Sequence, residues 1–315
     1  MPDDLTQRFA SAVEALTGEV SASAARFGIA VSGGPDSMAL LDLASRQYPD
    51  RIEAATVDHG LRAESAVEAE MVGEHCASRS IPHAILYPAT PIQGSIQAEA
   101  RAVRYALLEA WMDQRGLDWL LTAHHADDQL ETLVMRLNRG SGVAGLAGVR
   151  ARRGRILRPL LAVRKAELEA HVRAAGIPYV ADPSNVDARF DRARLRGHLA
   201  QAAWLDPQAA ARSAAALADT EEALGWMADR LYAERVTRGA DALVLDSGDI
   251  PRELLRRLLA RMMRDTAPDA PEPRGERIDQ AIIQLCRGRR VSIGACVVTG
   301  GVHWSVRRAP PRRSP

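Results

Sequence analysis

The sequence contains one lysine, three cysteines and no long hydrophobic run, and each shortage narrows what the chain can be. Because Lys165 is the only lysine, nearly all positive charge is carried by arginine. Cys76, Cys286 and Cys296 are far apart and form no CxxC pair, which indicates a reducing compartment and argues against a zinc finger. No apolar segment approaches the length of a membrane span, and the acidic N-terminus (MPDDLTQRFA) differs from a signal peptide. We therefore expect a cytoplasmic protein that does not enter a membrane.

Arginine is concentrated in short stretches along the chain. The net charge is only +1, yet RARRGRILRPLLAVRK (150–165) has seven positive charges and no acid, and further arginines cluster at 189–196 and beyond residue 287. Guanidinium groups match phosphate oxygens, so such clusters on an otherwise neutral chain are typical of a nucleic-acid surface. A GC-rich genome would explain the shortage of lysine, but it does not explain a run without acids.

Strand-like and helix-like segments alternate through the first two hundred residues. This alternation indicates βαβ units around a mostly parallel sheet, whose ligands bind at the carboxyl ends of the strands. We expect a Rossmann-like α/β domain at residues 1–205, with helices on both faces of the sheet. The expected strands are 27–31, 52–57, 82–87, 117–123 and 156–161, and the expected helices are 37–46, 63–79, 96–114, 126–137 and 165–175.

The character of the sequence changes after about residue 204. Residues 208–236 are rich in alanine and helical in pattern, and 251–264 form an amphipathic helix rich in arginine. DALVLD (241–246) and VSIGACVV (291–298) each have the pattern of a single strand. We expect residues 206–315 to form a second, smaller, mostly helical domain.

SGGPDS (32–37) follows the first strand directly and opens a helix, which is the plan of a phosphate-binding loop. It is not a Walker loop, because no lysine follows the glycines, and it lacks the spacing of GxGxxG. Gly33 and Gly34 let backbone N–H groups approach phosphate, and Pro35 fits the first turn of a helix. An acid is out of place in an anion site unless it faces a cation, so we expect Asp36 to bind Mg²⁺.

The stretch TAHHADDQLET follows the fourth expected strand, at the edge of the sheet where SGGPDS is expected. His124, Asp128 and Glu131 have the spacing i, i+4, i+7, which puts them on one helical face. On the same spacing, His125 and Asp127 point elsewhere. A zinc site and a solvated first helical turn are the alternatives, because both favour such residues. The position beside SGGPDS favours an active site.

Three more stretches complete the pattern of the first domain. TVDHGLR ends the second strand and puts Asp58 at the same edge of the sheet. RPLL follows at 158–161, and ADPSNVDARFDRARLR at 181–196 joins a turn-rich segment to closely spaced arginines. That combination is typical of a loop that binds phosphate or RNA, and a solvated linker before the second domain is the alternative.

In their order along the chain, these stretches resemble the motifs of a known family. SGGPDS is similar to the SGGxDS loop of the PP-loop ATP pyrophosphatases, which split ATP between its α- and β-phosphates. With VDHGLR, AHHADDQLET, RGSGVAGLAG, RPLL and DPSN, it resembles the tRNA(Ile)-lysidine synthetases over residues 27–196. Ala193 is a departure, because many members have an asparagine after the corresponding arginine, and the role of that asparagine is left open here.

The resemblance implies an ATP-dependent ligase that modifies tRNA(Ile) with a CAU anticodon. Oxygen 2 of the cytidine at the first anticodon position would attack the α-phosphate of ATP, and pyrophosphate would leave. The ε-amine of free L-lysine would then attack carbon 2 of the adenylated base and displace AMP, which gives lysidine. ATP, Mg²⁺, L-lysine and the tRNA are the expected partners, and the sequence does not decide whether the chain forms a homodimer.

The resemblance and the charge clusters together give candidate residues for each role. We expect catalysis to depend on Asp36, Arg104, His124, Asp128 and Arg196. We expect lysine to bind Asp128 and Glu131, and the metal ion to bind Asp36. The candidates for ATP binding are Val31, Ser32, Gly33, Gly34, Pro35, Asp36, Ser37 and Asp58, and the candidates for tRNA binding are Arg139, Arg152, Arg153, Arg192, Arg194, Arg257 and Arg261.

Two other functions fit part of the sequence. A tRNA thiolase of the same superfamily would need cysteines for sulfur relay or an iron–sulfur cluster, and the three cysteines do not have the spacing for either. A non-catalytic nucleotide-binding module would not need Asp128 and Glu131 beside the loop, nor the arginine clusters. The sequence does not show which carboxylate or histidine accepts a proton, or how the cognate tRNA is told from other tRNAs with a CAU anticodon.

Overall fold

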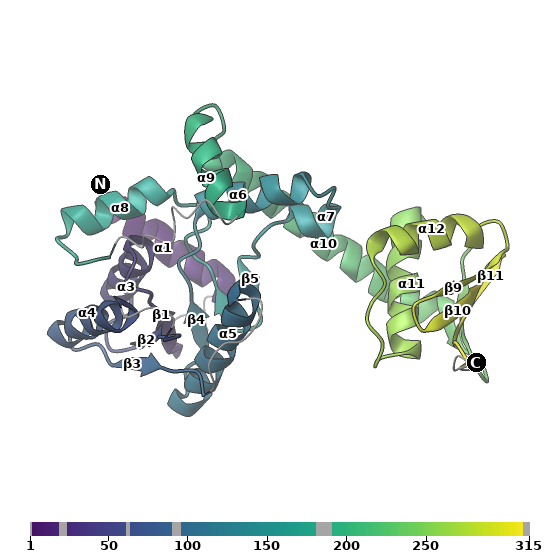
Figure 1. Ribbon diagram of the computed structural model, residues 1–315, viewed down its shortest axis with the longest axis horizontal. Helices are drawn as coiled ribbons and strands as arrows, with labels where there is room; N and C mark the ends of the chain where they lie inside the picture. Colours follow the sequence, from purple (N-terminus) through teal and green to yellow (C-terminus); the bar gives the residue numbers. More distant parts are fainter. Residues whose placement is uncertain (1, 19–23, 61–63, 90–95, 181–190, 311–315) are drawn as a thin grey trace. The chain divides into compact units, whose positions relative to one another are not determined.

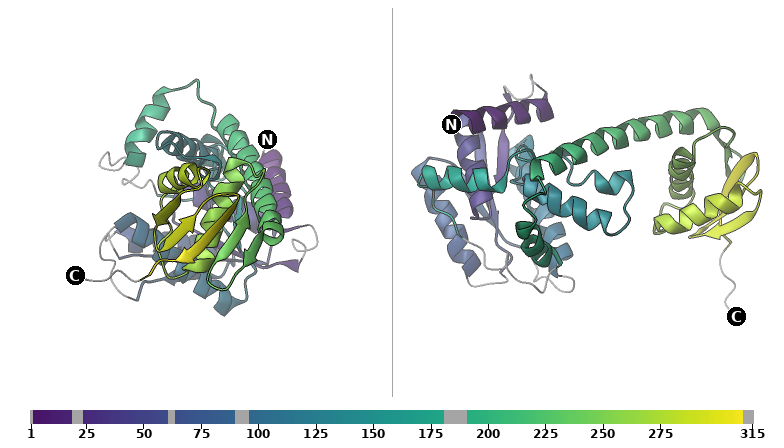
Figure 2. Two further views of the ribbon diagram at one scale, coloured as in Figure 1. Left: turned by 90° about the vertical axis from the view of Figure 1, so that its right-hand side faces the viewer. Right: turned by 90° about the horizontal axis from the view of Figure 1, so that it is seen from above.

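The structure, a computed structural model, describes residues 2–18, 24–60, 64–89, 96–180 and 191–310. The chain divides into two compact units, Met1–Ala218 and Asp219–Pro315 (Figure 1). The division falls inside α10 (Pro207–Arg235), farther along the chain than the boundary expected after residue 205. Figure 2 shows α10 as one continuous helix. Each unit has its own sheet and its own hydrophobic core.

The first unit is built on a six-stranded sheet with the strand order β3-β2-β1-β4-β6-β5. Neighbouring strands are parallel except β5 and β6, which pair antiparallel. The expected Rossmann-like, mostly parallel sheet is therefore confirmed. The strands are β1 (Phe27–Ala30), β2 (Ile52–Val57), β3 (His83–Leu86), β4 (Trp119–Leu121), β5 (Arg152–Arg153) and β6 (Ile156–Leu157), and the helices are α1 (Pro2–Thr17), α3 (Pro35–Gln47), α4 (Glu64–Ser78), α5 (Ile96–Arg115), α6 (Ala126–Leu137), α7 (Val143–Leu146), α8 (Lys165–Ala174) and α9 (Asp191–Gln201).

Helices cover both faces of this sheet, and the alternation of side chains along β1 shows how. Phe27 and Ile29 belong to the core cluster in which α1, α3, α4 and α8 pack. Gly28 faces the other side, where a Cβ atom would lie only 2.7 Å from the ring of Trp111 in α5. Trp111 belongs to a separate core cluster on that side, together with Leu108. Glycine at position 28 therefore lets α5 lie directly against the central strand.

A buried carboxylate anchors the helix that follows the SGGPDS loop. Asp42 of α3 is 0 % exposed, and its oxygens bind Arg79, the residue after α4 (2.6 Å), Arg46 (2.8 Å) and His171 of α8 (2.8 Å). Burial by itself would raise the pKa of Asp42, but the hydrogen bonds from these three side chains outweigh it and lower the pKa to about 2. The cluster fixes α3, α4 and α8 to one another.

The order of the strands decides which loops meet. β1 lies between β2 and β4, and all three run parallel, so their carboxyl ends form one edge of the sheet. SGGPDS leaves β1 at this edge, Asp58 follows β2, and His124 follows β4. The three motifs that the sequence places at the carboxyl ends of strands are therefore brought to one side of the sheet.

The second unit contains a five-stranded antiparallel sheet with the order β7-β8-β11-β10-β9 and two helices that pack in its core. The expected single strand VSIGACVV is wrong, because β9 and β10 form a hairpin that turns at Gly294, where φ is +55°. In the described residues, no helix is long and apolar enough to cross a membrane. The elements are β7 (Val236–Arg238), β8 (Leu243–Asp246), α11 (Arg252–Thr266), α12 (Gly275–Leu285), β9 (Arg290–Ile293), β10 (Cys296–Thr299) and β11 (His303–Arg308).

Candidate active site

The SGGPDS loop has the geometry of an anion site. Gly33 has φ +82°, a conformation that favours glycine, and Gly34 is the N-cap of α3 with Pro35 next to it in the first turn. No backbone carbonyl in the described part of the chain accepts a hydrogen bond from the N–H groups of Gly34, Asp36 or Ser37. These N–H groups are available to phosphate oxygens at the positive end of the helix dipole.

Two serines hold the loop closed across its base. Ser37 Oγ accepts a hydrogen bond from Ser32 N at 3.1 Å and donates to Gly34 O at 3.0 Å. Behind the loop, Val31 is buried in the core, and Gly33 O accepts from Val180 N at 2.9 Å. Ser37 therefore fixes the shape of the loop, while the exposed residue Ser32 is accessible to a ligand.

Asp36 is the acid of the loop, and its two oxygens differ. Oδ2 lies 3.5 Å from His125 Nε2, whereas Oδ1 is buried and has no hydrogen-bond partner in the described chain. A buried carboxylate oxygen without a partner is unfavourable, and a bound cation would satisfy it. Carboxylate oxygen is a ligand type that Mg²⁺ prefers. The residues present therefore fit a metal ion at Asp36.

His125 is the residue that helical spacing misplaced. It does not point elsewhere, because it is the N-cap of α6 with an extended backbone (φ −128°), so positions counted around the helix do not apply to it. Its side chain is 4 % exposed, and Nε2 lies 3.5 Å from Asp36 Oδ2 and 3.6 Å from Asp128 Oδ2. Burial by itself would lower the pKa of His125, but the surrounding carboxylates, Asp36 foremost, outweigh it and raise the pKa.

Asp128 and Glu131 lie one turn apart on α6 and share one cation. Arg196 of α9 donates from Nε to Glu131 Oε1 at 2.5 Å, and its Nη2 lies 3.6 Å from Asp128 Oδ1. Both carboxylates are buried. Burial by itself would lower the pKa of Arg196, but the hydrogen bond to Glu131 and the nearby carboxylates raise it. The pair forms a site for a cationic group, and Arg196 supplies that group in this structure.

His124 precedes α6, so the helical spacing does not apply to it either. Its ring is half-buried, and Nδ1 lies 3.1 Å from Thr122 Oγ1. Asp127 makes a structural contact, because its Oδ2 accepts from Lys165 N at the start of α8, where Lys165 Nζ pairs with Glu169 at 3.7 Å. Within the described ranges, no three His, Cys, Asp or Glu side chains are grouped to hold a metal ion, so the zinc alternative gains no support.

The end of β2 contributes Asp58 and His59 to the same edge. Asp58 Oδ1 accepts from Ser65 Oγ at 2.6 Å and from Gly60 N at 2.8 Å, which lowers the pKa of Asp58. Both ring nitrogens of His59 are buried without a partner in the described chain. Burial and the nearby charge of Arg104 lower the pKa of His59. Arg104 of α5 therefore lies near this edge.

The arginines expected to bind tRNA use their charge in different ways in the first unit. Arg139 and Arg153 are exposed and form no ion pair with a described acid. Arg152 stacks over Trp119 and donates to a backbone carbonyl. Arg194 is exposed on α9. The side chain of Arg192 and the DPSN segment lie outside the described residues.

In the second unit, neighbouring acids neutralise the two arginines expected to bind tRNA. Arg257 of α11 is 17 % exposed, and its terminal nitrogens bind both oxygens of Glu221 at 2.9 and 2.7 Å. Arg261 binds Asp229 at 2.5 Å and stacks over the ring of Tyr232. The acids come from α10, so no count of charges along α11 could show this pairing. A role for either arginine in tRNA binding stays a prediction.

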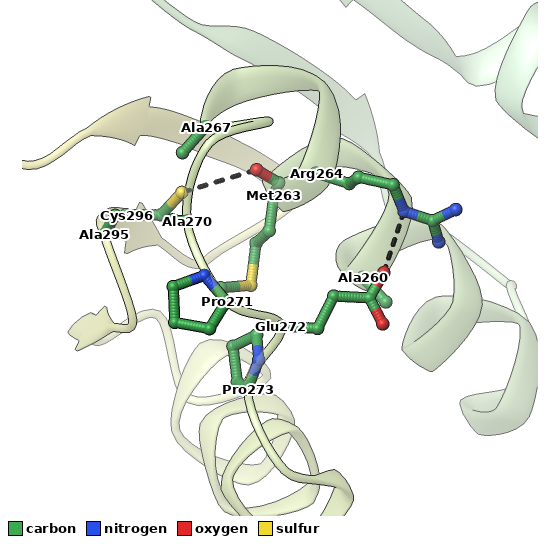
Figure 3. Close-up of a pocket in the computed structure, with 10 residues that line it drawn as sticks. All are labelled: Ala260, Met263, Arg264, Ala267, Ala270, Pro271, Glu272, Pro273, Ala295 and Cys296. Atoms are coloured by element: carbon green, nitrogen blue, oxygen red, sulfur yellow. Dashed lines mark hydrogen bonds and ion pairs between the residues drawn. The ribbon is translucent and has the colours of Figure 1, made fainter. Parts of the chain in front are cut away.

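A small pocket in the second unit lies between α11, the loop after it and the start of β10 (Figure 3). Its lining is mostly apolar. Arg264 and Glu272 pair across it at 2.9 Å, and Cys296 Sγ lies 3.7 Å from Met263 O. This lining lacks the convergent carboxylates and open N–H groups found at the edge of the first sheet, so we place the candidate active site in the first unit.

The chain is similar to known proteins along nearly its whole length. Residues 5–203 match the PP-loop domain family. A tRNA(Ile)-lysidine synthase of Zymomonas mobilis is 40 % identical over 311 residues, which cover 95 % of this chain and 94 % of the relative. A tRNA(Ile)-lysidine synthase of Novosphingobium aromaticivorans is 42 % identical, with 91 % of this chain and 90 % of the relative covered.

A solved structure adds the fold. The U34-tRNA thiolase NcsA of Methanococcus maripaludis superposes with a TM-score of 0.56 at 16 % identity, covering 69 % of this chain and 80 % of that one. At this identity the likeness shows the fold alone. The PP-loop match covers more than half of the chain, and the named relatives span both units at 40 % and 42 % identity. The chain therefore belongs to the PP-loop family and, within it, to the tRNA(Ile)-lysidine synthases.

Proposed function

We propose that the chain ligates free L-lysine to carbon 2 of the wobble cytidine of tRNA(Ile) with a CAU anticodon. ATP first adenylates oxygen 2 of the cytidine and releases pyrophosphate, and an amine of lysine then displaces AMP. The observation that carries the proposal is the contact of His125 with both Asp36 and Asp128 at one edge of the sheet. The phosphate loop therefore lies beside a site for a cationic group. Adenylation needs the first, and binding of the lysine ammonium group needs the second.

For adenylation, the chain supplies donors and one acid. The open N–H groups of Gly34 and Ser37 bind phosphate oxygens, and the hydroxyl of Ser32 adds a donor. Asp36 would hold Mg²⁺ through Oδ1, the oxygen that has no other partner. A metal ion held by Asp36 would neutralise phosphate charge that otherwise repels the attacking oxygen. Arg104, near the same edge, stabilises a phosphate or the adenylated base.

For the second half-reaction, Asp128 and Glu131 bind the ammonium group of lysine. Arg196 already binds both carboxylates, so lysine must share them with Arg196 or displace it. His124, or one of the two carboxylates, would take the proton whose loss makes the amine nucleophilic. The sites for both half-reactions lie on the first unit.

We place tRNA on the charged surface of both predicted domains. Residues 206–315 would bind the body of the tRNA while residues 1–205 hold the anticodon, because one loop offers little area by which to choose a tRNA. Arg139 and Arg153 are the stronger candidates for phosphate contacts, since no described acid neutralises them. ATP, free lysine and tRNA meet in the cytoplasm, where we place the chain. Gel filtration of the purified chain would decide between a monomer and a homodimer.

Removal of the second unit tests whether the two domains bind different parts of the tRNA. Ala210, Ala211 and Ala214 at the start of α10 are buried, and Gln208 donates to Ala162 O in the first unit. The truncation should therefore end at Ala218 and keep these contacts. We expect the shortened chain to bind ATP as before but to bind tRNA more weakly and with a smaller salt dependence. Equal tRNA affinity and equal salt slope would show that the second unit has another role.

The reaction itself is tested with labelled lysine. The chain is incubated with ATP, isotopically labelled lysine and an unmodified tRNA(Ile) transcript, and lysidine is sought by mass spectrometry of the nucleosides. We expect label in the nucleoside only when ATP and tRNA are both present, and pyrophosphate release with ATP and tRNA even without lysine. A second tRNA with a CAU anticodon is the matched control. Pyrophosphate release that ignores tRNA would contradict the proposal.

The cysteines give no reason to prefer a thiolase. Cys76 lies in α4, Cys286 follows α12, and Cys296 begins β10. Cys76 and Cys296 are buried and Cys286 is exposed, and all three are free. Burial raises the pKa of Cys76 to about 11, so this thiol is a poor nucleophile at neutral pH.

A further inference from the structure

The side chain of His125 contacts two elements at once. As the N-cap of α6, its Nδ1 accepts from Asp128 N at 3.4 Å, while Asp128 Oδ2 accepts in return from His125 N at 3.1 Å. Across the ring, Nε2 lies 3.5 Å from Asp36 Oδ2 and 3.6 Å from Asp128 Oδ2. Asp127 completes the set of charged groups around the ring, with Oδ2 3.7 Å from Nδ1. The ring therefore sits between the first turns of α3 and α6.

The capping bond decides which nitrogen carries the proton. A backbone N–H that donates to Nδ1 requires a lone pair there, so a neutral ring carries its hydrogen on Nε2. A protonated ring carries a hydrogen on Nε2 as well. In either state, Nε2–H is a donor that faces Asp36 Oδ2 and Asp128 Oδ2.

This donor restrains Oδ2 of Asp36 and makes no contact with Oδ1. Oδ1 of Asp36 is buried and has no partner in the described chain. A carboxylate held at one oxygen cannot turn freely, so the direction of the second oxygen is fixed as well. The same ring contact limits the movement of Asp128, which binds Arg196 through its other oxygen.

We propose that His125 is a positioning residue, whose Nε2–H holds Asp36 Oδ2 so that Oδ1 faces the metal–phosphate complex, and which ties Asp36 to the amine-binding carboxylate Asp128. The role rests on the proposed function, because that function gives Asp36 and Asp128 their tasks. His125 does not touch the reacting atoms. It sets the distance between a group that serves adenylation and a group that serves attack by lysine.

Two substitutions separate the capping bond from the Nε2 contact. In His125→Asn, the amide oxygen can take the place of Nδ1 and cap α6, because asparagine is among the best N-cap residues, but no group reaches Asp36. In His125→Gln, the amide nitrogen can take the place of Nε2, while the N-cap is poor. His171→Gln is the matched control, because His171 is another buried histidine that binds a carboxylate, Asp42, away from the SGGPDS loop.

Three measurements are made on each full-length variant. The first is the rate of pyrophosphate release with ATP and tRNA in the absence of lysine. The second is the affinity for Mn²⁺ in the presence of α,β-methylene-ATP, followed by electron paramagnetic resonance, which does not depend on turnover. The third is the melting temperature. If the wild-type chain releases no pyrophosphate with ATP and tRNA, the proposed function fails, and the Mn²⁺ titrations still test the position of Asp36.

For His125→Asn, we expect a melting temperature near that of the wild type, with Mn²⁺ affinity and pyrophosphate release each lower by about tenfold to a hundredfold. His125→Gln should recover most of both while it melts at a lower temperature. His171→Gln should lower the melting temperature and leave Mn²⁺ affinity unchanged. The proposal is overturned if His125→Asn binds Mn²⁺ as the wild type does. It is also overturned if both His125 variants lose Mn²⁺ binding in proportion to their loss of stability.

Discussion

The two units bury different kinds of side chain. Among the described residues, every buried polar or charged side chain lies in Met1–Ala218, including Asp42, Asp128 and Glu131. The core of the second unit is apolar, and its arginines pair with acids near the surface, as Arg261 does with Asp229. Burying a charge is unfavourable unless partners satisfy it. The contrast teaches that the buried charges of the described residues lie in the first unit, among them the anchor of α3 and the carboxylates of the candidate active site.

The largest expected effect in this comparison is the loss of the buried anchor. Asp42→Ala leaves Arg46, Arg79 and His171 facing a cavity without their shared carboxylate. Breaking a buried ion cluster in this way costs about 3–5 kcal/mol of unfolding free energy. Urea denaturation measures it. A cost below that of a typical exposed ion pair would show that the buried charges of the first unit are no more important than the surface pairs of the second.

The same anchor predicts how the first unit responds to acid. The pKa of Asp42 is lowered from 3.8 to about 2, so its ionised form stabilises the fold. This stabilisation is complete above the ordinary pKa and is lost as the pH falls through the folded value, between about pH 4 and pH 2. Acid unfolding followed by circular dichroism should show a steep loss in this range for the wild type, and Asp42→Ala should lack that component.

Asp36→Asn tests whether a buried charge in the active site serves catalysis. We expect pyrophosphate release to fall at least a hundredfold, about 2.7 kcal/mol of transition-state stabilisation, because the amide binds a metal ion poorly. The melting temperature should change little, because Oδ1 of Asp36 has no partner to lose and the amide can still contact His125 Nε2 through the position of Oδ2. Asp50→Asn, at an exposed position with φ +62° that asparagine tolerates, is the matched control. An unchanged rate for Asp36→Asn would refute the metal role.

Glu131→Gln sharpens the comparison inside the active site. It removes one charge from the pair that Arg196 binds. We expect the KM for lysine to rise about tenfold, as for a lost hydrogen bond to a charged group, while pyrophosphate release without lysine stays near the wild-type rate. Glu109→Gln on the exposed face of α5 is the control. An unchanged KM would mean that lysine binds elsewhere.

The smallest effects are expected for surface arginines. Arg153 and Arg261 can be compared, because Arg153 has no described acidic partner and Arg261 is paired with Asp229. Arg153→Gln removes a charge that no described acid neutralises, so the slope of log affinity for tRNA against log salt should fall by about one. Arg261→Gln should change the slope less, because Asp229 already binds this guanidinium, and should change stability by less than about 1 kcal/mol. Equal slopes for both variants would show that pairing does not decide which arginines meet tRNA.

Much of the fold follows from patterns that are local in the sequence. Helix α6 spans Ala126–Leu137 and β2 spans Ile52–Val57, as their patterns predict. The hairpin of β9 and β10 was missed because a single glycine inside an apolar stretch reads as part of one strand. Helix α1 carried a signal that could have been used, since Leu5, Phe9 and Val13 recur every four residues and are buried.

The candidate site was predictable in its loops but not in its contacts. The strand order of the parallel sheet brings SGGPDS, Asp58 and His124 to one edge. The alternation of strand-like and helix-like segments in the sequence is enough to predict this arrangement. The pairing of Arg196 with Glu131 joins α9 to α6, and no spacing rule reaches across that separation. The helical period does not hold for His125, which lies one residue before the helix begins. N-cap preferences do not identify the position either, because histidine is an unusual N-cap residue.

Lys165 is the only side-chain amine of the chain, so it is the only side chain of this kind that could react with an adenylated base. An adenylated base awaiting an amine could be attacked by any side-chain amine nearby, and this chain carries a single one. Lys165 is fixed at its backbone by Asp127, and its Nζ is paired with Glu169. The chain is therefore nearly free of self-acceptors for its own activated substrate. For the same reason, an amine-selective reagent would label one side chain besides the N-terminus, which offers a single spectroscopic reporter at the start of α8.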